Sequence, residues 1–151
     1  LGTATADANG SFSITSSQLA DNSYTLTVKA TDAAGNESAA SSGLTIEIDT
    51  AAPGQPTIDA PADTTFTINN PTITGTAEAG STVELLTGGS VIGTATAGSD
   101  GTFSVTSSPL FDTSDDQTYE LTVTATDAAG NTSSASTELE ITIETGANDA
   151  A

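Results

Sequence analysis

Apolar and polar residues alternate along most of this chain. In "YTLTVKAT" (residues 24–31) every second residue is apolar, and Thr or Lys stands between them. Because successive side chains of a strand point to opposite faces, this pattern predicts a half-buried strand. Its inner face would carry Tyr24, Leu26, Val28 and Ala30. No segment shows a sustained helical period, so we predict an all-β chain.

Seven strand positions are predicted in the second part of the chain, and the first of them is split. Gly, Asn, Asp and Pro separate the strands, which is typical of an immunoglobulin-like Greek-key β-sandwich. Tyr24 and Tyr119 open the sixth strand, where such sandwiches carry a corner tyrosine. Glu138 and Glu140 would face outward and discourage edge pairing. The strands are expected at 56–59 with 65–68, 72–77, 82–87, 91–97, 102–107, 119–126 and 137–144.

The chain repeats itself. "ATDAAGN" occurs at 30–36 and again at 125–131. Around it, twelve of eighteen residues and eighteen of twenty-seven residues are identical between two pairs of aligned stretches, 2–19 with 93–110 and 24–50 with 119–145. The two copies are offset by about 91 to 95 residues, close to the roughly 100 residues of an immunoglobulin-like module. This repeat suits tandem modules, the first of them partial. We expect the C-terminal half of a module at 1–49, a linker at 50–56, a complete module at 52–145, and a further linker or tail at 146–151.

The linker "IDTAAPGQP" contains Pro53 and Pro56, which restrict the backbone, so we expect it to be semi-rigid. The chain starts at Leu1 without Met, and the first module lacks the equivalents of 51–92 and with them its first three strands. Its sheets would have open edges and an open core. Either the chain is an excerpt of a longer polypeptide, which we favour, or another chain supplies the strands.

Charge excludes several classes of function. Twenty Asp and Glu residues against the single Lys29 give a net charge of −19, which rules out nucleic acid and anionic membranes as partners. No apolar run approaches the roughly 18 residues of a membrane span. The chain has no His, Cys or Arg, so the usual general bases, nucleophiles and phosphate clamps are absent. We therefore predict that the chain is not an enzyme and that its surface attracts cations.

Several motifs together resemble a known family. "PTITGTAEAGSTVEL", "SVIGTATAGSDGTFSVT", "YELTVTATDAAGNTS" and "IDTAAPGQP" resemble the bacterial immunoglobulin-like repeats of giant surface adhesins, including the repeats-in-toxin type exported by type I secretion. The resemblance implies many modules in tandem, an extracellular location on the bacterial surface, and calcium ions at module junctions. It also implies that the modules extend the protein and contact their neighbours, while other domains bind a host or another surface.

Strand topology brings several carboxylates to one such junction. The loops after the second, fourth and sixth strands return to the pole that faces the preceding module, and Asp49 is delivered there by that module's last strand. Calcium takes about six to eight oxygen ligands from carboxylates and carbonyls, which loops can supply. The candidate ligands at this junction are Asp49, Glu78, Asp100 and Asp127, the last with Asn131 nearby. By the repeat, Asp32 with Asp7 or Asn9 would serve the junction before the partial module.

Alternatives stay open for each acidic group. "DAAGN" is also good turn chemistry, with an Asp-capped turn and a Gly in left-handed conformation. Asp112, Asp115 and Asp116 in the insertion "LFDTSDDQTY" form either a solvated loop or a second cation site. Glu144 takes the place of Asp49 at the far end.

The predicted function is a calcium-stiffened spacer of a surface adhesin that supports adhesion or biofilm formation. The alternatives are a module that binds a glycan or protein, and a subunit of a self-assembling surface filament. An aromatic-lined pocket would favour the binding module.

Overall fold

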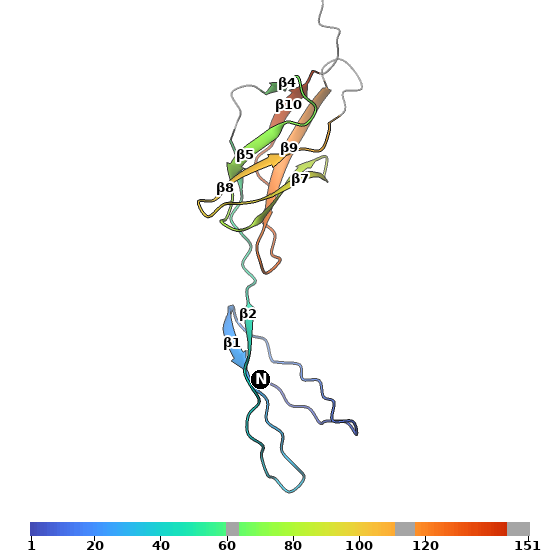
Figure 1. Cartoon of the computed structure of the whole chain (residues 1–151), viewed down its shortest axis with the longest axis vertical. Helices are drawn as coiled ribbons and strands as arrows, with labels where there is room; N and C mark the ends of the chain where they lie inside the picture. The colour runs from blue at the N-terminus through green and yellow to red at the C-terminus, as the bar shows by residue number, and fades with distance from the viewer. Residues whose placement is uncertain (60–63, 111–116, 145–151) are drawn as a thin grey trace, which may run out of the picture. The chain divides into compact units, whose positions relative to one another are not determined.

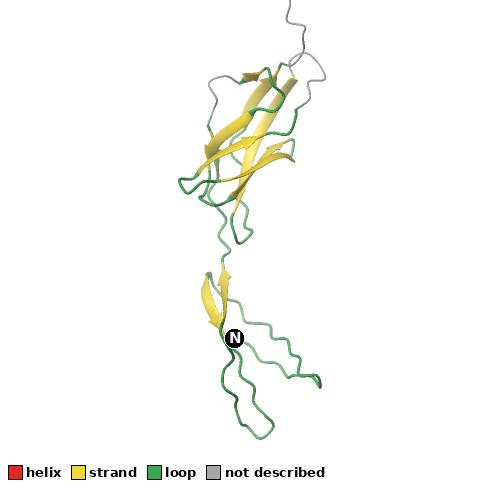
Figure 2. Ribbon diagram, in the orientation of Figure 1, coloured by secondary structure: helices red, strands yellow, loops and turns green. Residues whose placement is uncertain are grey.

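A computed structural model describes residues 1–59, 64–110 and 117–144 of the 151-residue chain. It divides into two compact units, unit 1 (Leu1–Thr50) and unit 2 (Ala51–Ala151). Within the described residues all regular structure is β-strand, as Figure 2 shows, so none of these residues belongs to a helix that could cross a membrane. The prediction of an all-β chain is confirmed.

Unit 2 is a sandwich of two β-sheets (Figure 1). One sheet has the strand order β3-β5-β8 and the other has the order β4-β10-β9-β6-β7. Every predicted strand is present, and its ends lie within two residues of the prediction. The strands are β3 (Thr57–Ile58), β4 (Thr65–Phe66), β5 (Thr72–Thr76), β6 (Thr82–Thr87), β7 (Ser90–Thr96), β8 (Thr102–Thr106), β9 (Gln117–Thr126) and β10 (Leu139–Ile143).

The first strand of unit 2 is divided between the two sheets, as the sequence predicts. β3 pairs antiparallel with β5 in the three-stranded sheet. β4 pairs in parallel with β10 in the five-stranded sheet, where Thr65 is opposite Thr142 and Phe66 is opposite Ile143. The two halves of this strand therefore each cover an edge on the same side of the sandwich.

The other side of the sandwich is closed by β7 and β8. A Cβ atom at Gly93 of β7 would lie 2.7 Å from the carbonyl oxygen of Thr106 and 2.9 Å from the Val105 side chain. The backbone N–H of Ser108 also donates to the carbonyl of Ile92 at 2.5 Å. Glycine at position 93 thus lets two strands of different sheets approach closely.

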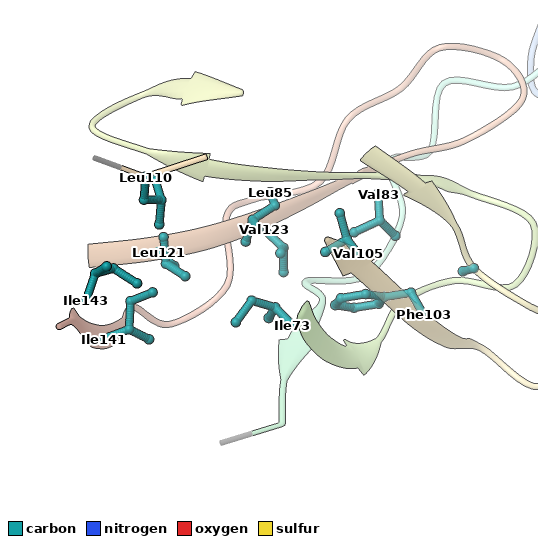
Figure 3. Close-up of a cluster of buried hydrophobic side chains, with 11 residues drawn as sticks. Ile73, Val83, Leu85, Phe103, Val105, Leu110, Leu121, Val123, Ile141 and Ile143 are labelled. Carbon is teal, nitrogen blue, oxygen red and sulfur yellow. The ribbon is translucent and has the colours of Figure 1, made fainter. Parts of the chain in front are cut away.

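The core lies between the two sheets of unit 2. Alternate residues of β5 and β8 are buried, and the residues between them are exposed, which is the burial expected from the period-two pattern. The ring of Phe103 lies against Gly75, where a Cβ atom would stand 2.6 Å from its Cζ atom. Figure 3 shows the other side chains of this cluster, including Ile73, Val83, Leu85, Val105, Leu121, Val123, Ile141 and Ile143.

Unit 1 contains one antiparallel pair, β1 (Asn22–Leu26) with β2 (Leu44–Ile48). Leu26 is opposite Leu44 in this pair, and its repeat equivalent in unit 2 has the same register, with Leu121 opposite Leu139. The hydroxyl of Tyr24 donates to the carbonyl of Ala20 at 2.9 Å. This bond confirms Tyr24 as the predicted corner tyrosine.

One prediction for unit 1 is wrong. The pattern of residues 24–31 predicts a half-buried strand with Val28 and Ala30 on its inner face, but β1 ends at Leu26 and both residues are exposed. Their equivalents in unit 2, Val123 and Ala125, are buried because the sheet β3-β5-β8 faces them and β6 pairs with β9 beside them. Unit 1 has only β1 and β2, with no strand in the place of β5 or β6, so alternation alone cannot bury these side chains.

Candidate functional site

The repeated turn "DAAGN" is closed by its own first and last residues. In unit 2 the Asp127 carboxylate accepts the backbone N–H of Asn131 at Oδ1 and the Asn131 side-chain amide at Oδ2, both at 2.9 Å. The backbone N–H of Asp127 donates to the Asn131 carbonyl at 3.0 Å. Gly130 has φ of 94°, a left-handed conformation that glycine adopts without strain. We call this arrangement the Asp–Asn clasp.

Unit 1 has the same clasp. Asp32 accepts the backbone N–H and the side-chain amide of Asn36 at 2.9 and 2.8 Å, and Gly35 has φ of 89°. In both units the side-chain amide of the Asn is the main cause of a lowered pKa of the Asp carboxyl. The predicted turn chemistry is therefore present in both copies, and both carboxylates are ionised at neutral pH.

A second kind of repeated turn holds the acid at different positions in the two units. In unit 1 Asp7 accepts the backbone N–H groups of Asn9 and Ser11 at 2.8 and 2.9 Å. Unit 2 has Gly98 at the position of Asp7, and its acid is Asp100, which aligns with Asn9. Asp100 accepts the backbone N–H of Thr102 at 3.0 Å and its hydroxyl at 2.8 Å, and these bonds lower the pKa of Asp100.

Sequence reasoning missed a pair of serines that extends the sheet beside each clasp. The Ser133 hydroxyl accepts the Ala125 N–H, and the Ser136 hydroxyl accepts the Val123 N–H, both at 3.0 Å. The backbone N–H of each serine donates back to the carbonyl of the same partner residue. Each buried hydroxyl thus takes the place of a backbone carbonyl where β10 has not yet begun.

The same serine pair exists in unit 1 but is exposed there. Ser38 and Ser41 accept the N–H groups of Ala30 and Val28 at 3.0 and 3.1 Å. The available signal was the spacing S-x-x-S, three residues apart, two residues after each "ATDAAGN". Serine in a polar loop is common, so the spacing alone does not predict these bonds.

The loops that carry the predicted ligands of unit 2 lie at one end of its sandwich (Figure 1). Pairing places the ends of β5, β7 and β9 beside the starts of β8 and β6, so the turns holding Glu78, Asp100 and Asp127 are neighbours. The N–H of Ala77 donates to the carbonyl of Gly101 at 2.9 Å and joins two of these loops. Glu78 itself is exposed.

The linker residues are attached to this same end of unit 2. Pro53 and Pro56 are buried, and the Gln55 side-chain amide donates to the carbonyl of Ala135 at 2.6 Å. At the end of unit 1, both carboxylate oxygens of Asp21 accept the Thr50 hydroxyl, at 3.0 and 3.1 Å. Thr50 is thus bonded within unit 1, and Gln55 is bonded within unit 2.

The three acids of unit 2 share a pole but do not form a cluster. No group of three or more His, Cys, Asp or Glu side chains close enough to hold a metal occurs in the described ranges. Their chemistry nevertheless fits a hard cation, because an ionised carboxylate has about four acceptor sites and the clasp uses one on each oxygen of Asp127. Asp49 belongs to unit 1. The ligand set Asp49, Glu78, Asp100 and Asp127, and the set Asp32 with Asp7, stay predictions.

The structure describes one of two further predicted groups of acidic residues and not the other. The insertion residues Asp112, Asp115 and Asp116 lie outside the described residues. Glu138 and Glu140 are exposed on the outer face of β10 and before it, as predicted. The N–H of Glu144 donates to the carbonyl of Phe66 at 2.8 Å, so the backbone at this position belongs to the β4–β10 pair.

The part of the chain that the structure describes has no ligand pocket lined by exposed aromatic side chains. An open hollow lies near one end of the three-stranded sheet, and its only aromatic lining residue, Phe103, is buried in the core. Thr74, Thr102 and Ser104 supply hydroxyls around it, and Asp59 supplies one carboxylate. This lining gives a sugar ring no exposed aromatic face on which to stack.

Two facing sheets and a split first strand make unit 2 an immunoglobulin-like β-sandwich, and the corner tyrosine Tyr24 belongs to the same fold in unit 1. Residues 52–142 match the family described as Bacterial Ig domain, and residues 1–50 match the family described as Bacterial Ig-like domain. The chain therefore belongs to the bacterial Ig domain family.

The sequence relative and the similar structures come from different kinds of protein. Chitinase A1 of Niallia circulans is 37% identical over 139 residues, a match that covers 87% of this chain and 19% of the relative. The fibronectin(III)-like modules of Clostridium thermocellum CbhA superpose with a TM-score of 0.51 at 19% identity, over 83% of this chain and 64% of theirs, which shows the shared fold alone. The BSP domain of a biofilm-associated protein matches with a TM-score of 0.44 at 25% identity, over 97% of this chain and 23% of that one.

Proposed function

We propose that this chain is a non-catalytic extender of a large bacterial surface protein that supports adhesion or biofilm formation, and that calcium stiffens the junctions between its modules. The tandem arrangement carries this proposal, because each unit repeats the same turns and holds ionised carboxylates in them. The partners are neighbouring modules of the same polypeptide, outside the cell. Export by type I secretion, as in repeats-in-toxin adhesins, belongs to the same proposal.

Calcium has a clear physical part in this proposal. The chain has a net charge of −19, so adjoining acidic poles repel each other. A divalent cation shared between Asp49 of unit 1 and the pole loops of unit 2 would replace that repulsion by coordination to both units. The clasps would then serve two purposes, since they fix the loop backbone and keep the Asp carboxylates ionised.

The test is a calcium titration of the full chain by calorimetry, with thermal melts in calcium and in chelator. We expect saturable binding and a higher melting temperature in calcium. Asp49→Asn should remove a site, whereas Glu138→Gln, which removes one exposed charge just before β10, should leave binding unchanged. Equal losses in the two variants, or an equal effect of sodium at matched ionic strength, would show that only general screening is at work.

The relative named Chitinase A1 favours a second candidate, a polysaccharide-binding module within a secreted polysaccharide-degrading enzyme. The two readings differ in whether the chain itself contacts polysaccharide. Co-sedimentation with insoluble chitin separates them. Because the described surface offers no stacking pocket, we expect the chain to stay in the supernatant, and saturable retention on chitin would favour the binding module.

A further inference from the structure

The turn at residues 7–11 has Asn9 and Gly10 at its tip, and nowhere else in the sequence does Gly follow Asn. The Asp7 carboxylate accepts the N–H groups of Asn9 and Ser11 at 2.8 and 2.9 Å. The N–H of Gly10 donates to the Asp7 carbonyl at 3.0 Å. Asn9 is exposed, and in the described part of the chain its side-chain amide has no hydrogen-bond partner. Asp7 therefore closes the turn, while the Asn9 side chain stays unbound.

The exposure of this turn does not depend on unit 1 being partial. In the complete sandwich of unit 2 the equivalent turn residues Gly98, Ser99 and Asp100 are exposed as well. The backbone also repeats, because Gly101 and Gly10 have φ of 81° and 80°. The N–H of Gly101 donates to the carbonyl of Gly98 at 2.9 Å, as that of Gly10 does in unit 1. A turn of this kind thus lies on the surface of either unit.

An exposed asparagine amide can react with the backbone nitrogen of the next residue. That nitrogen attacks the side-chain Cγ atom, a C–N bond forms, and the bond from Cγ to Nδ2 breaks. Nδ2 leaves as ammonia and takes up the proton of the attacking N–H group. Water then opens the five-membered imide at one of its two carbonyls, which leaves either aspartate or isoaspartate. The reaction consumes one water molecule and requires no enzyme and no oxidant.

The surroundings favour this reaction at Asn9 over the other described asparagines. Gly10 has no side chain to hinder the attack, and even an added Cβ atom there would meet nothing within 4 Å. Asn36 and Asn131 are instead held in the clasps, where their side-chain amides donate to a carboxylate at 2.8 and 2.9 Å. Asn70 is followed by Pro71, which has no N–H group and cannot close the ring.

The equivalent turn of unit 2 contains Asp100 before Gly101, and an Asp can close the same ring by losing water. An ionised carboxylate is a poor target for that attack, however. The backbone N–H and the hydroxyl of Thr102 donate to Asp100 and lower its pKa, so it is ionised at neutral pH. Of the two matched turns, we therefore expect only that of unit 1 to react.

We infer that Asn9 is a site of spontaneous deamidation and that Asp7, by closing the turn, sets its rate. The nitrogen of Gly10 is free to attack only after its bond to the Asp7 carbonyl opens, and exposed turns open locally at low cost. The product carries a second carboxylate two residues after Asp7, at the position that Asp100 holds in unit 2. Deamidation thus adds one negative charge to a chain whose net charge is already −19.

The experiment incubates the full chain at mildly alkaline pH and follows it by isoelectric focusing and by mass spectrometry of its peptides. A free peptide of residues 5–13 is incubated beside it as the unstructured reference. We expect a form with one additional negative charge, modified at Asn9, that accumulates more slowly than in the free peptide. Complete conversion of the peptide with no conversion of the chain, or equal conversion at Asn9, Asn36 and Asn131, would overturn the inference.

Three variants test the part played by the turn. Asp7→Ala removes two hydrogen bonds and should speed deamidation of Asn9 by roughly three- to tenfold. Glu47→Gln removes an exposed charge from β2 of the same unit and should leave the rate unchanged. Gly10→Ala should lose most of the product, although a side chain at positive φ strains the turn. An unchanged rate in Asp7→Ala, or an equal rise in Glu47→Gln, would overturn the role of Asp7, and full conversion in Gly10→Ala would overturn the route through Gly10.

Discussion

Asp32 and Asp127 each hold a turn through both carboxylate oxygens, which makes the ionised side chain part of the fold. The bonds come from the backbone and the side-chain amide of the Asn four residues on. Because these donors favour the charged form, the pKa of each Asp lies below its ordinary 3.8. The contribution of each clasp to stability is therefore complete above that pH and is lost as the pH falls through the lowered pKa.

Acidification should loosen the clasp of unit 2, and Asp127→Asn should remove that dependence. Below the ordinary Asp pKa of 3.8, the unfolded state takes up a proton before the folded state does, so stability falls. Denaturant melts at a series of pH values measure this fall. The control Glu138→Gln removes a charge from an exposed strand-flanking position and should retain the Asp127 contribution. An identical pH slope in both variants would contradict a role for the clasp.

Ser136→Ala should destabilise unit 2 by about 1–3 kcal/mol, because the buried N–H of Val123 loses its acceptor. The same change at the exposed Ser41 provides a matched control in the same chain. Water can replace the Ser41 hydroxyl, so its cost should stay within about 0.5 kcal/mol. Urea unfolding of the two variants gives the comparison, and equal costs would show that burial is not what makes the serine pair important.

At the scale of strands, alternation and turn residues were enough to locate all of unit 2's elements. β6 and β8 begin where the sequence predicts, since Thr and apolar residues alternate there between clear turn signals. The serine pairs could not be predicted because their role depends on a backbone that only the folded hairpin brings near. The exposure of Val28 could not be predicted for another reason. Alternation shows which residues share one face of a strand, but burial also requires a second strand that covers this face.

Gly75→Ala tests how tightly the strands of unit 2 are fitted. A Cβ atom at this position of β5 meets the ring of Phe103 at 2.6 Å and the carbonyl of Thr57. Overpacking of this kind costs about 1–3 kcal/mol. Gly54→Ala is the control, because a Cβ atom there meets nothing within 4 Å. Thermal unfolding should separate the two variants clearly, and a neutral Gly75→Ala would mean that the ring moves aside freely.

For the whole molecule, the internal repeat predicted that two related units follow each other, while the metal site could not be fixed in the same way. Topology correctly placed Glu78, Asp100 and Asp127 at one pole of unit 2. Whether carboxylates meet at one ion depends on side-chain directions in loops, and these are set by local bonds such as those of the clasp. A sequence can show which loops are neighbours, but it does not show whether their carboxylate groups come close enough to share one ion.

The divided first strand has a mechanical consequence for such a chain. β4 and β10 lie parallel, and bonds from Thr142 to Thr64 and from Glu144 to Phe66, each 2.8 Å, join them near the end of unit 2. A pull on the two ends of the unit drives these strands past each other, so the bonds are loaded together in shear instead of opening one by one. Resistance to forced unfolding follows the unfolding barrier. This short parallel pair thus contributes resistance to tension along the chain.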